Sequence, residues 1–465
     1  MKRLDFVRFI GTKSSMNNQN KFTGLIRHTQ KVFGLGALIS EFDQRRPYKQ
    51  VNDAKVRFGI TSGLGAGLTS LNELSAHTGV SRSVLEDFLK LEGLGSRLRK
   101  FVKGMIKRMK RGKMINLENV GGKSLAAVDG VETFKKRFTE EEFQHGILSG
   151  AIDRHCQVSV HHDPKTHDII AYETYHRIVI ICLISERGPF PVAWAYQQSD
   201  AYLVFKKWIF NGCKREDHPS VEGSVEKRKQ EGELTVFKAP LTELKDANSN
   251  KLPFDIVVGD GLYDKAPIIE AVESFGAVLI AVQKDERRSL RQEAQDEFTT
   301  RPPDKLWNEM KREFEGWSEV FIDQHIKKSD KNIKIVRVVR RHGDGTVVDN
   351  YFYCSNKSWI TPRLVEWCRH YRWREENGFN SWTNEWSLLK HVFHHSAAAC
   401  DAMIGFIFIA IISVVNYQLG NLRRGGREFK KTLKDFFRDV ISGYKNSGKT
   451  LREHLLTYMQ AKHPI

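Results

Sequence analysis

The sequence has few cysteines, and their spacing gives them no evident structural role. The six cysteines, in a chain of 465 residues, include no C-x-x-C pair and no regular spacing. A disulfide framework is therefore not expected, and reduced thiols in a cytosolic protein are the simplest interpretation. The N-terminus carries basic residues, but no apolar run follows them, so no secretory signal is predicted.

Long apolar runs are also missing. The one strongly apolar stretch, Ala402–Val415, has fourteen residues, which is short of the roughly 20 that a bilayer-spanning helix requires. We predict a buried helix there and no membrane association. Internal repeats and long low-complexity segments are absent too, so the length predicts two or three domains with a large core.

Acidic residues are outnumbered by basic ones. The chain has 74 lysines and arginines against 56 aspartates and glutamates, which gives a formal net charge of +18. This excess favours a polyanionic partner, most simply double-stranded DNA.

Two N-terminal segments are candidates for DNA contact. Residues 70–90 have the pattern of a helix-turn-helix with Gly79 at its turn, and Arg82 would begin the recognition helix. An ordinary helical hairpin is the alternative. Residues 96–113 contain nine basic residues and no acidic one, which favours a helix that follows phosphates. We assign DNA contact there to Lys107, Arg108, Lys110 and Arg111.

Near the C-terminus, Gly443–Thr450 reads GYKNSGKT and fits the phosphate-loop pattern G-x-x-x-x-G-K-[ST]. That loop requires a buried strand before it and further strands around it. The apolar residues that precede it have helical spacing, and only fifteen residues follow. We therefore predict no nucleotide binding.

From about residue 119 the pattern indicates strands that alternate with helices. The alternation predicts an α/β fold with a mixed sheet. Predicted strands cover 124–130, 175–184, 189–198, 254–261 and 277–282, and predicted helices cover 201–210 and 266–276. Residues 214–252 are expected to be mostly loop with some helix, and residues 318–353 a β-rich insertion. From Thr361 onward the chain is predicted to be helical.

Two predicted strands each end in an aspartate that a glycine follows. These are Asp129 in AAVDG and Asp260 in VVGDG. Ligands of open α/β sheets gather outside the carboxyl ends of strands, so the two side chains are placed to meet. Each Asp-Gly pair taken alone is ordinary turn chemistry. Together, on a basic chain, they suggest a magnesium site, because Mg²⁺ prefers oxygen ligands and substrate phosphate.

A third carboxylate is expected on the predicted helix 370–386, where Glu375 and Glu376 both compete for the role. Arg372 and Glu376 are four residues apart and share a helix face. A phosphate-binding guanidinium would then lie beside a metal-binding carboxylate. The alternative is a surface ion pair, which this spacing commonly produces.

In this ordered set the sequence resembles the bacterial insertion-sequence transposases of the DDE class that carry a β-strand insertion before the third acid. The resemblance covers roughly residues 120–420. It implies a ribonuclease-H-like mixed sheet whose first strand carries Asp129 and whose fourth strand precedes Asp260. Arg372 and Glu376 match the Arg and Glu of the Y-x-x-R-x-x-x-E-x-x-x-x-x-x-K signature. The Tyr and Lys positions depart from it, being Arg369 and Thr383, with Tyr371 and Lys390 nearby.

The resemblance also implies the chemistry. Asp129, Asp260 and Glu376 would be the catalytic and metal-binding acids for two Mg²⁺ ions, which Mn²⁺ could replace, with Asp129 bridging both. The substrates would be transposon ends and target DNA, cut and joined by in-line phosphoryl transfer without a covalent protein–DNA intermediate. A homodimer in the synaptic complex and a cytoplasmic, nucleoid-associated location in a bacterium are expected.

The implied organisation has five parts. A helical, basic DNA-binding region (1–118) precedes the first part of the catalytic core (119–300), the β-rich insertion (301–360), the final helices of the core (361–420) and a helical tail (421–465).

Three alternatives remain open. The chain could be a non-catalytic, domesticated DNA-binding regulator, although a decayed copy need not keep all three acids. It could be a ribonuclease-H-like nuclease that cuts without joining. Finally, His391, His394 and His395, with Cys400 nearby, could bind zinc, but without a paired carboxylate or a second Cys/His set, packing or DNA contact is the preferred interpretation.

Overall fold

The computed structural model describes residues 53–423 with short gaps, together with Leu25 and Ser442. The gaps are 112–119, 186–187, 200, 215–217, 220–224, 248–249, 285–288, 310–311, 324–330, 386 and 391–395. The glycine-rich string 443–450 and most of the predicted tail therefore lie outside the described residues, as do His391, His394 and His395.

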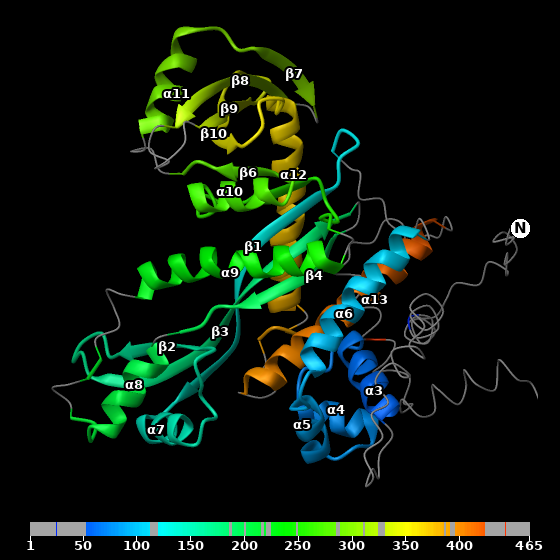
Figure 1. Cartoon of the computed structure of the whole chain (residues 1–465), viewed down its shortest axis with the longest axis vertical. Helices are drawn as coiled ribbons and strands as arrows, with labels where there is room; N and C mark the ends of the chain where they lie inside the picture. Colours follow the sequence, from blue (N-terminus) through cyan, green and yellow to red (C-terminus); the bar gives the residue numbers. More distant parts are fainter. Residues whose placement is uncertain are drawn as a thin grey trace, which may run out of the picture.

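One mixed sheet of ten strands organises the described chain, which confirms the predicted α/β class (Figure 1). Its order is β2-β3-β1-β5-β6-β10-β9-β8-β7, with β4 also paired to β3. The strands are β1 (Leu125–Phe138), β2 (Cys156–His162), β3 (Ile169–Ile184), β4 (Pro189–Tyr196), β5 (Ile256–Gly259), β6 (Val278–Val282), β7 (Lys305–Glu309), β8 (Arg312–Asp323), β9 (Lys331–Arg341) and β10 (Val347–Ser355).

The centre of the sheet is parallel and its two wings are antiparallel. Strands β1, β5 and β6 run parallel, whereas β3 pairs antiparallel with β1, and β10 pairs antiparallel with β6. Strand β5 is buried along its whole length, as a strand covered on both faces must be. The predicted β-rich insertion is thus not a separate layer, because β10 joins β7–β9 to the same sheet.

Strand β1 is longer than the sequence suggested. The predicted strand stops at Gly130 after Asp129, but β1 continues to Phe138 because β3 stays paired with it as far as Phe138 and Tyr172. A register shift between Thr133 and Lys136 interrupts this pairing. Asp129 therefore lies within a strand, and the expectation that it ends one is wrong.

Two helices carry the parts of the chain that matter most for the site. Helix α9 (Val225–Ala247) packs on β3 and β4, and α12 (Pro362–Asn380) contacts β1, β3 and β5 and also β8 and β9. Figure 1 shows α12 running from the β7–β10 end of the sheet to its centre. The expectation of mostly loop over 214–252 is wrong, because Phe237, Leu241 and Leu244 form a buried stripe at helical spacing.

The remaining core elements are short. Helices α8 (Ala201–Phe210) and α10 (Ala266–Ser274) occupy the predicted ranges. Helices α7 (Glu140–Leu148) and α11 (Ser289–Thr300), and strand β2, were not predicted from the sequence. With α8 and β2, helix α7 encloses a second, smaller hydrophobic core around Phe143 and Tyr172, whose rings stack 4.4 Å apart.

The described part of the N-terminal region, residues 53–111, is mainly helical, as predicted. Helix α4 (Leu71–Thr78) ends at Gly79, which has φ 63°, and α5 (Arg82–Leu89) begins after the N-cap Ser81. A left-handed residue at this position favours glycine. Two helices around a turn at Gly79 are present as predicted, and Leu74, Val80, Leu85 and Phe88 are buried. A helix-turn-helix and an ordinary helical hairpin share this arrangement, so the DNA-reading role of α5 stays a prediction.

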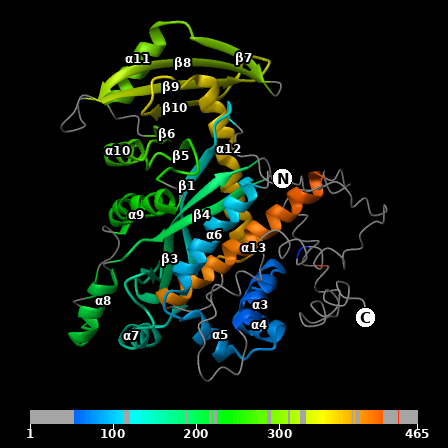
Figure 2. The ribbon, with the colours of Figure 1, turned by 45° about the vertical axis from the view of Figure 1, so that its right-hand side comes forward.

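A long apolar helix joins this region to the sheet. Helix α13 (Ala397–Arg423) contacts α3 (Asp53–Gly65), α5, α6 (Leu94–Arg111) and β4, and Figure 2 shows α6 and α13 side by side. Its segment Ala397–Tyr417 is long and apolar enough to span a membrane, unlike the shorter run predicted, but 89% of the tested window is buried inside the structure. A buried core helix passes the same test, and the contacts of α13 are those of one.

The basic helix α6 is not a free arm. Its apolar residues Leu98, Val102 and Met105 are buried, and α6 contacts α13 and β4. Arg99 forms an ion pair with Asp401 of α13, and its guanidinium lies 4.1 Å from the ring centre of Trp194 on β4. Asp401 also accepts a hydrogen bond from Trp194 Nε1 at 2.8 Å. Arg99 therefore fastens the N-terminal helices to the sheet.

Removing the acid of this cluster should loosen that attachment. Asp401→Ala leaves the partly buried guanidinium of Arg99 and the indole N–H of Trp194 without their shared acceptor, so we expect a loss of roughly 1–3 kcal/mol in unfolding free energy. Urea denaturation measures it. The control is Glu86→Ala, which breaks the exposed pair with Arg82 and should cost less than about 1 kcal/mol. Equal losses in the two variants would contradict this role for Asp401.

Candidate functional site

The two predicted aspartates lie side by side at the carboxyl end of β5. The last parallel pairs are Leu125 with Ile256, Ala126 with Val257 and Ala127 with Val258. Asp129 and Asp260 each lie two residues beyond the last pair, so the register places them at the same level of neighbouring chain segments. The carboxylate of Asp260 accepts a hydrogen bond from Leu262 N at 2.9 Å, and that of Asp129 accepts one from Gly130 N at 2.8 Å.

Their closeness is visible in the electrostatics of Asp129. Burial is the main cause that raises the pKa of Asp129 from 3.8 to about 7, and the charge of Asp260 raises it further. The hydrogen bond from Gly130 and the charge of Arg372 act in the opposite direction. A cation bound near two carboxylates would stabilise the charged form of both.

Helix α12 brings a guanidinium to this place. Arg372 influences Asp129 from α12, its side chain is only 15% exposed, and it forms an ion pair with Glu376. The predicted pairing of these two residues on one helix face is confirmed. Within the described residues the buried Nη1 of Arg372 has no hydrogen-bond partner. One end of the guanidinium is thus held by Glu376, and the other retains a donor for an oxygen ligand.

A lysine forms an ion pair with Asp260. Lys284, which follows β6, places Nζ 3.2 Å from Asp260 Oδ2 and is 65% exposed. It was not selected from the sequence. Its position after the strand next to β5 is the signal that could have found it, since neighbouring parallel strands end at one edge.

The third acid is not brought to the aspartates in this arrangement. Within the part of the chain that the structure describes, no three His, Cys, Asp or Glu side chains form a metal-binding group. Glu376 is instead paired with Arg372. The side chains of Glu375 and Glu385 lie outside the described residues, so the choice of Glu376 stays a prediction.

Arg369, at the Tyr position of the signature, is used to hold α12 in place. It forms an ion pair with Asp349 of β10 at 3.3 Å, and its guanidinium lies 4.5 Å from the ring centre of Tyr351. At the Lys position, Thr383 lies half-buried in a π-helical turn, Ser381–Glu385, and Lys390 is exposed. At the Tyr position, the departure from the signature thus places a residue with a structural role, Arg369.

The residues predicted to contact DNA lie on other elements. Lys107, Arg108, Lys110 and Arg111 are all exposed on α6, and Lys110 donates to the carbonyl oxygen of Pro253 at 3.1 Å. The side chain of Arg82 on α5 is 59% exposed and pairs with Glu86. Their exposure agrees with a role in binding a polyanion, which stays a prediction.

The sequence analysis also missed a buried acid behind the aspartates. Glu233 of α9 is 2% exposed, and its charge is one of the causes that raise the pKa of Asp129. It was overlooked because residues 214–252 were expected to be mostly loop.

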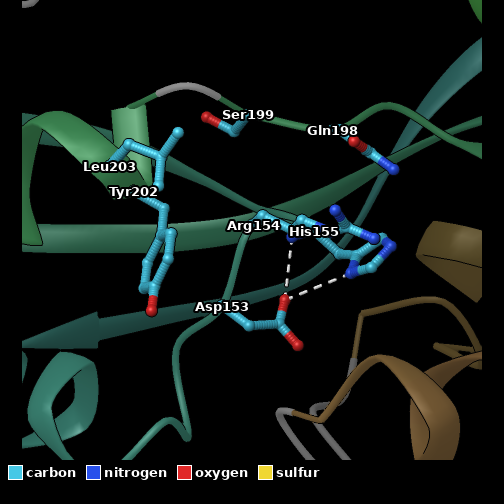
Figure 3. A pocket seen from close by; sticks show the side chains of 7 residues that line it. All are labelled: Asp153, Arg154, His155, Gln198, Ser199, Tyr202 and Leu203. Atoms are coloured by element: carbon cyan, nitrogen blue, oxygen red, sulfur yellow. Dashed lines mark hydrogen bonds and ion pairs between the residues drawn. The ribbon is translucent and has the colours of Figure 1, made fainter.

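Two other features do not join this site. A pocket of about 420 Å³ is lined by Asp153, Arg154, His155, Gln198, Ser199, Tyr202 and Leu203, none of which was predicted to be functional (Figure 3). Cys400, the possible zinc ligand, is buried, and Nε2 of His176 lies 3.5 Å from its sulfur and 3.8 Å from the sulfur of Cys156.

A comparison with known families gives this geometry a context. Residues 224–412 match the family model described as Transposase DDE domain. The matched segment includes Asp260, Arg372 and Glu376 and begins after Asp129. No curated protein matches the chain. The family match supports a transposase function in general.

The raised pKa of Asp129 predicts how stability depends on pH. Between 3.8 and about 7 the folded chain keeps a proton that the unfolded chain releases, so stability falls as the pH rises through this range. At pH 8 in chelator, the free energy of unfolding of Asp129→Asn should therefore be roughly 1–3 kcal/mol higher than that of the wild type. The difference should vanish near pH 4. Thermal melts at both pH values measure it.

The control for this experiment is Glu293→Gln, on the exposed surface of α11. It should change neither melt. If Asp129→Asn and the wild type melt alike at pH 8, the account of an Asp129 charge that is disfavoured, chiefly by burial, is contradicted.

Proposed function

We propose that this chain is the DNA transposase of an insertion sequence, which cuts the ends of its element and joins them to target DNA. The observation that carries the proposal is the parallel register that puts Asp129 beside Asp260, with Arg372 facing them. The match of residues 224–412 to a transposase DDE domain agrees with it.

A ribonuclease-H-like core is part of the proposal. Without the short β2, the chain order of the central strands is β1, β3, β4, β5 and β6, and their order in the sheet is β4-β3-β1-β5-β6. Asp129 lies on the first of these strands and Asp260 directly follows the fourth. This is the placement that the resemblance to insertion-sequence transposases implies.

The donor chemistry of the site fits divalent magnesium. Asp129 and Asp260 offer hard oxygen ligands, and their mutual repulsion is relieved when a cation lies between them. We propose that Asp129, Asp260 and Glu376 hold two Mg²⁺ ions, which would stabilise the attacking and leaving oxygens of an in-line displacement.

The chain's own residues would orient the DNA. The unpaired Nη1 of Arg372 can donate to a phosphate oxygen, and a phosphate that takes over the guanidinium would release Glu376 toward the aspartates. Lys284, exposed beside Asp260, is a second phosphate contact. If the side chains of Arg372 and Lys284 exchange their carboxylate partners for DNA phosphates, DNA binding would bring Glu376 to Asp129 and Asp260.

The duplex outside the cleavage site would lie on the N-terminal helices. Arg82 begins α5, where a recognition helix meets base edges, and the exposed Lys107, Arg108, Lys110 and Arg111 of α6 would follow the backbone. A homodimer in the synaptic complex and a cytoplasmic, nucleoid-associated location follow from the same proposal.

Charge removal at Asp129 tests the proposal against a DNA-binding regulator. Asp129→Asn keeps the shape but halves the charge of the aspartate pair, so cleavage and joining should fall by at least about 100-fold while DNA binding changes little. Strand breakage and strand transfer are assayed on DNA carrying the terminal repeats that flank the gene. Mg²⁺ and Mn²⁺ should support the wild type, whereas Ca²⁺ should permit binding without efficient cleavage.

Full activity of Asp129→Asn, or of the wild type in excess chelator, would contradict the metal-dependent mechanism. Specific binding without any breakage by the wild type would favour the regulator. Breakage without strand transfer would instead favour a nuclease.

The basic face of α6 should supply affinity more than sequence choice. Replacing Lys107, Arg108, Lys110 and Arg111 by glutamine should weaken binding to all duplexes alike and reduce the salt dependence by up to about four phosphate contacts. Fluorescence anisotropy across a salt series measures both. As a control, Lys305→Gln on the distant edge strand β7 should leave the slope unchanged. A loss confined to one sequence would make α6 a base-reading element instead.

A further inference from the structure

Glu233 is a buried acid with a complete set of partners directly behind the aspartate pair. It lies on α9 with 2% of its surface exposed. Its Oε2 is 2.9 Å from Nη2 of Arg177 on β3, and its Oε1 accepts a hydrogen bond from the Tyr263 hydroxyl at 2.9 Å. Buried carboxylates cost several kcal/mol to desolvate, so such a group is kept where it has partners and a role.

Two glycines leave room for this cluster. A Cβ atom on Gly130 would lie 2.5 Å from Glu233 Oε2, and one on Gly259 would lie 2.8 Å from Cβ of Tyr263. Neither glycine has a positive φ. Gly130, inside β1, is therefore not the turn residue that an Asp-Gly pair suggests, whereas Gly261 after Asp260 does lie in a turn. Gly130 and Gly259 let a carboxylate and an aromatic ring pack against the backbone of the two strands.

The cluster and Asp129 lie on opposite faces of the sheet. Successive residues of a strand point to opposite sides, so Gly130 and Asp129 face apart. The last parallel pair is Ala127 with Val258, and the next residues along the two strands are Val128, which shares the face of Gly130, and Gly259. Asp260 directly follows Gly259, the last residue of β5. Glu233 and Tyr263 thus support from behind the two backbone segments that carry Asp129 and Asp260.

We propose that Glu233, together with Tyr263, is a positioning element for the divalent-cation site, an inference that rests on the proposed function. Through Gly130 and Gly259 it fixes the spacing of the two aspartates, and its buried negative charge strengthens their attraction for a cation. The close approach of Glu233 Oε2 to Gly130, and of Tyr263 to Gly259, supports this role.

The charge is tested by Glu233→Gln. The amide keeps the size of the side chain, with its oxygen toward Arg177 and its N–H₂ donating to the Tyr263 oxygen, so the packing is retained. Groups that support metal ligands typically contribute 10–100-fold to affinity. We expect roughly a 10-fold rise in the MgCl₂ concentration that half-saturates the increase in melting temperature of the DNA-free protein. The same shift should appear in strand cleavage, with the rate at saturating Mg²⁺ close to that of the wild type.

Two further variants complete the experiment. Tyr263→Phe keeps the charge but removes one hydrogen bond, so it should shift the Mg²⁺ requirement in the same direction by less, and it replaces Glu233→Gln if that variant does not fold. Glu243→Gln, on the same helix but paired with Lys103 of α6, is the matched control and should leave the Mg²⁺ requirement unchanged.

The outcomes separate the two proposals. If the wild type responds to Mg²⁺ and the Glu233 and Tyr263 variants respond at the same concentrations, Glu233 is a structural core residue and this inference is wrong. If the wild type itself neither gains thermal stability from Mg²⁺ nor cleaves DNA with it, the proposed function fails, and the inference that depends on it fails as well.

Discussion

The parallel pairing of β1 with β5 is the constraint on which the rest of the site depends. It is only three residue pairs long, yet it sets Asp129 beside Asp260 although 131 positions separate them in the sequence. Everything else is arranged around this register. Helix α12 supplies Arg372 from one face, and α9 supplies Glu233 from the other. A slip of one residue would turn one aspartate to the wrong side of the sheet.

The same sheet also connects the candidate site to the basic N-terminal helices. Arg99, Trp194 and Asp401 tie α6 to β4 and α13, so the basic surface of α6 has a fixed relation to the strands. At the other end, Arg369 and Asp349 tie α12 to β10. Helix α12 is thereby held at the insertion, which suits the proposed roles of Arg372 as a phosphate contact and of Glu376 as a metal ligand.

Much of this arrangement could be predicted from the sequence. The rest could not be predicted, and the reasons are physical. Apolar runs such as 277–282 have one stable outcome, a buried strand, and the strand-end rule then selected Asp260. Helix α9 was missed because its first half is dominated by charge, which masked the apolar stripe that begins at Leu234. Glu233 could not be selected, because its role arises only when α9 packs behind the strands, whereas Lys284 was overlooked although its position after β6 was a usable signal. Gly130 was considered only as part of a possible Asp-Gly turn, since the space that it provides depends on α9.

The central claim is that Asp129, Asp260 and Glu376 hold one divalent-metal site. Iron-mediated cleavage of the protein backbone tests it most directly. Fe²⁺ substituted for Mg²⁺ on the DNA-bound protein, with ascorbate and peroxide, cuts the chain beside its own ligands, and mass spectrometry locates the cuts. The account predicts cuts clustered near residues 129, 260 and 376 that excess Mg²⁺ suppresses. Cuts elsewhere, or a third cluster near Glu385 in place of Glu376, would contradict it.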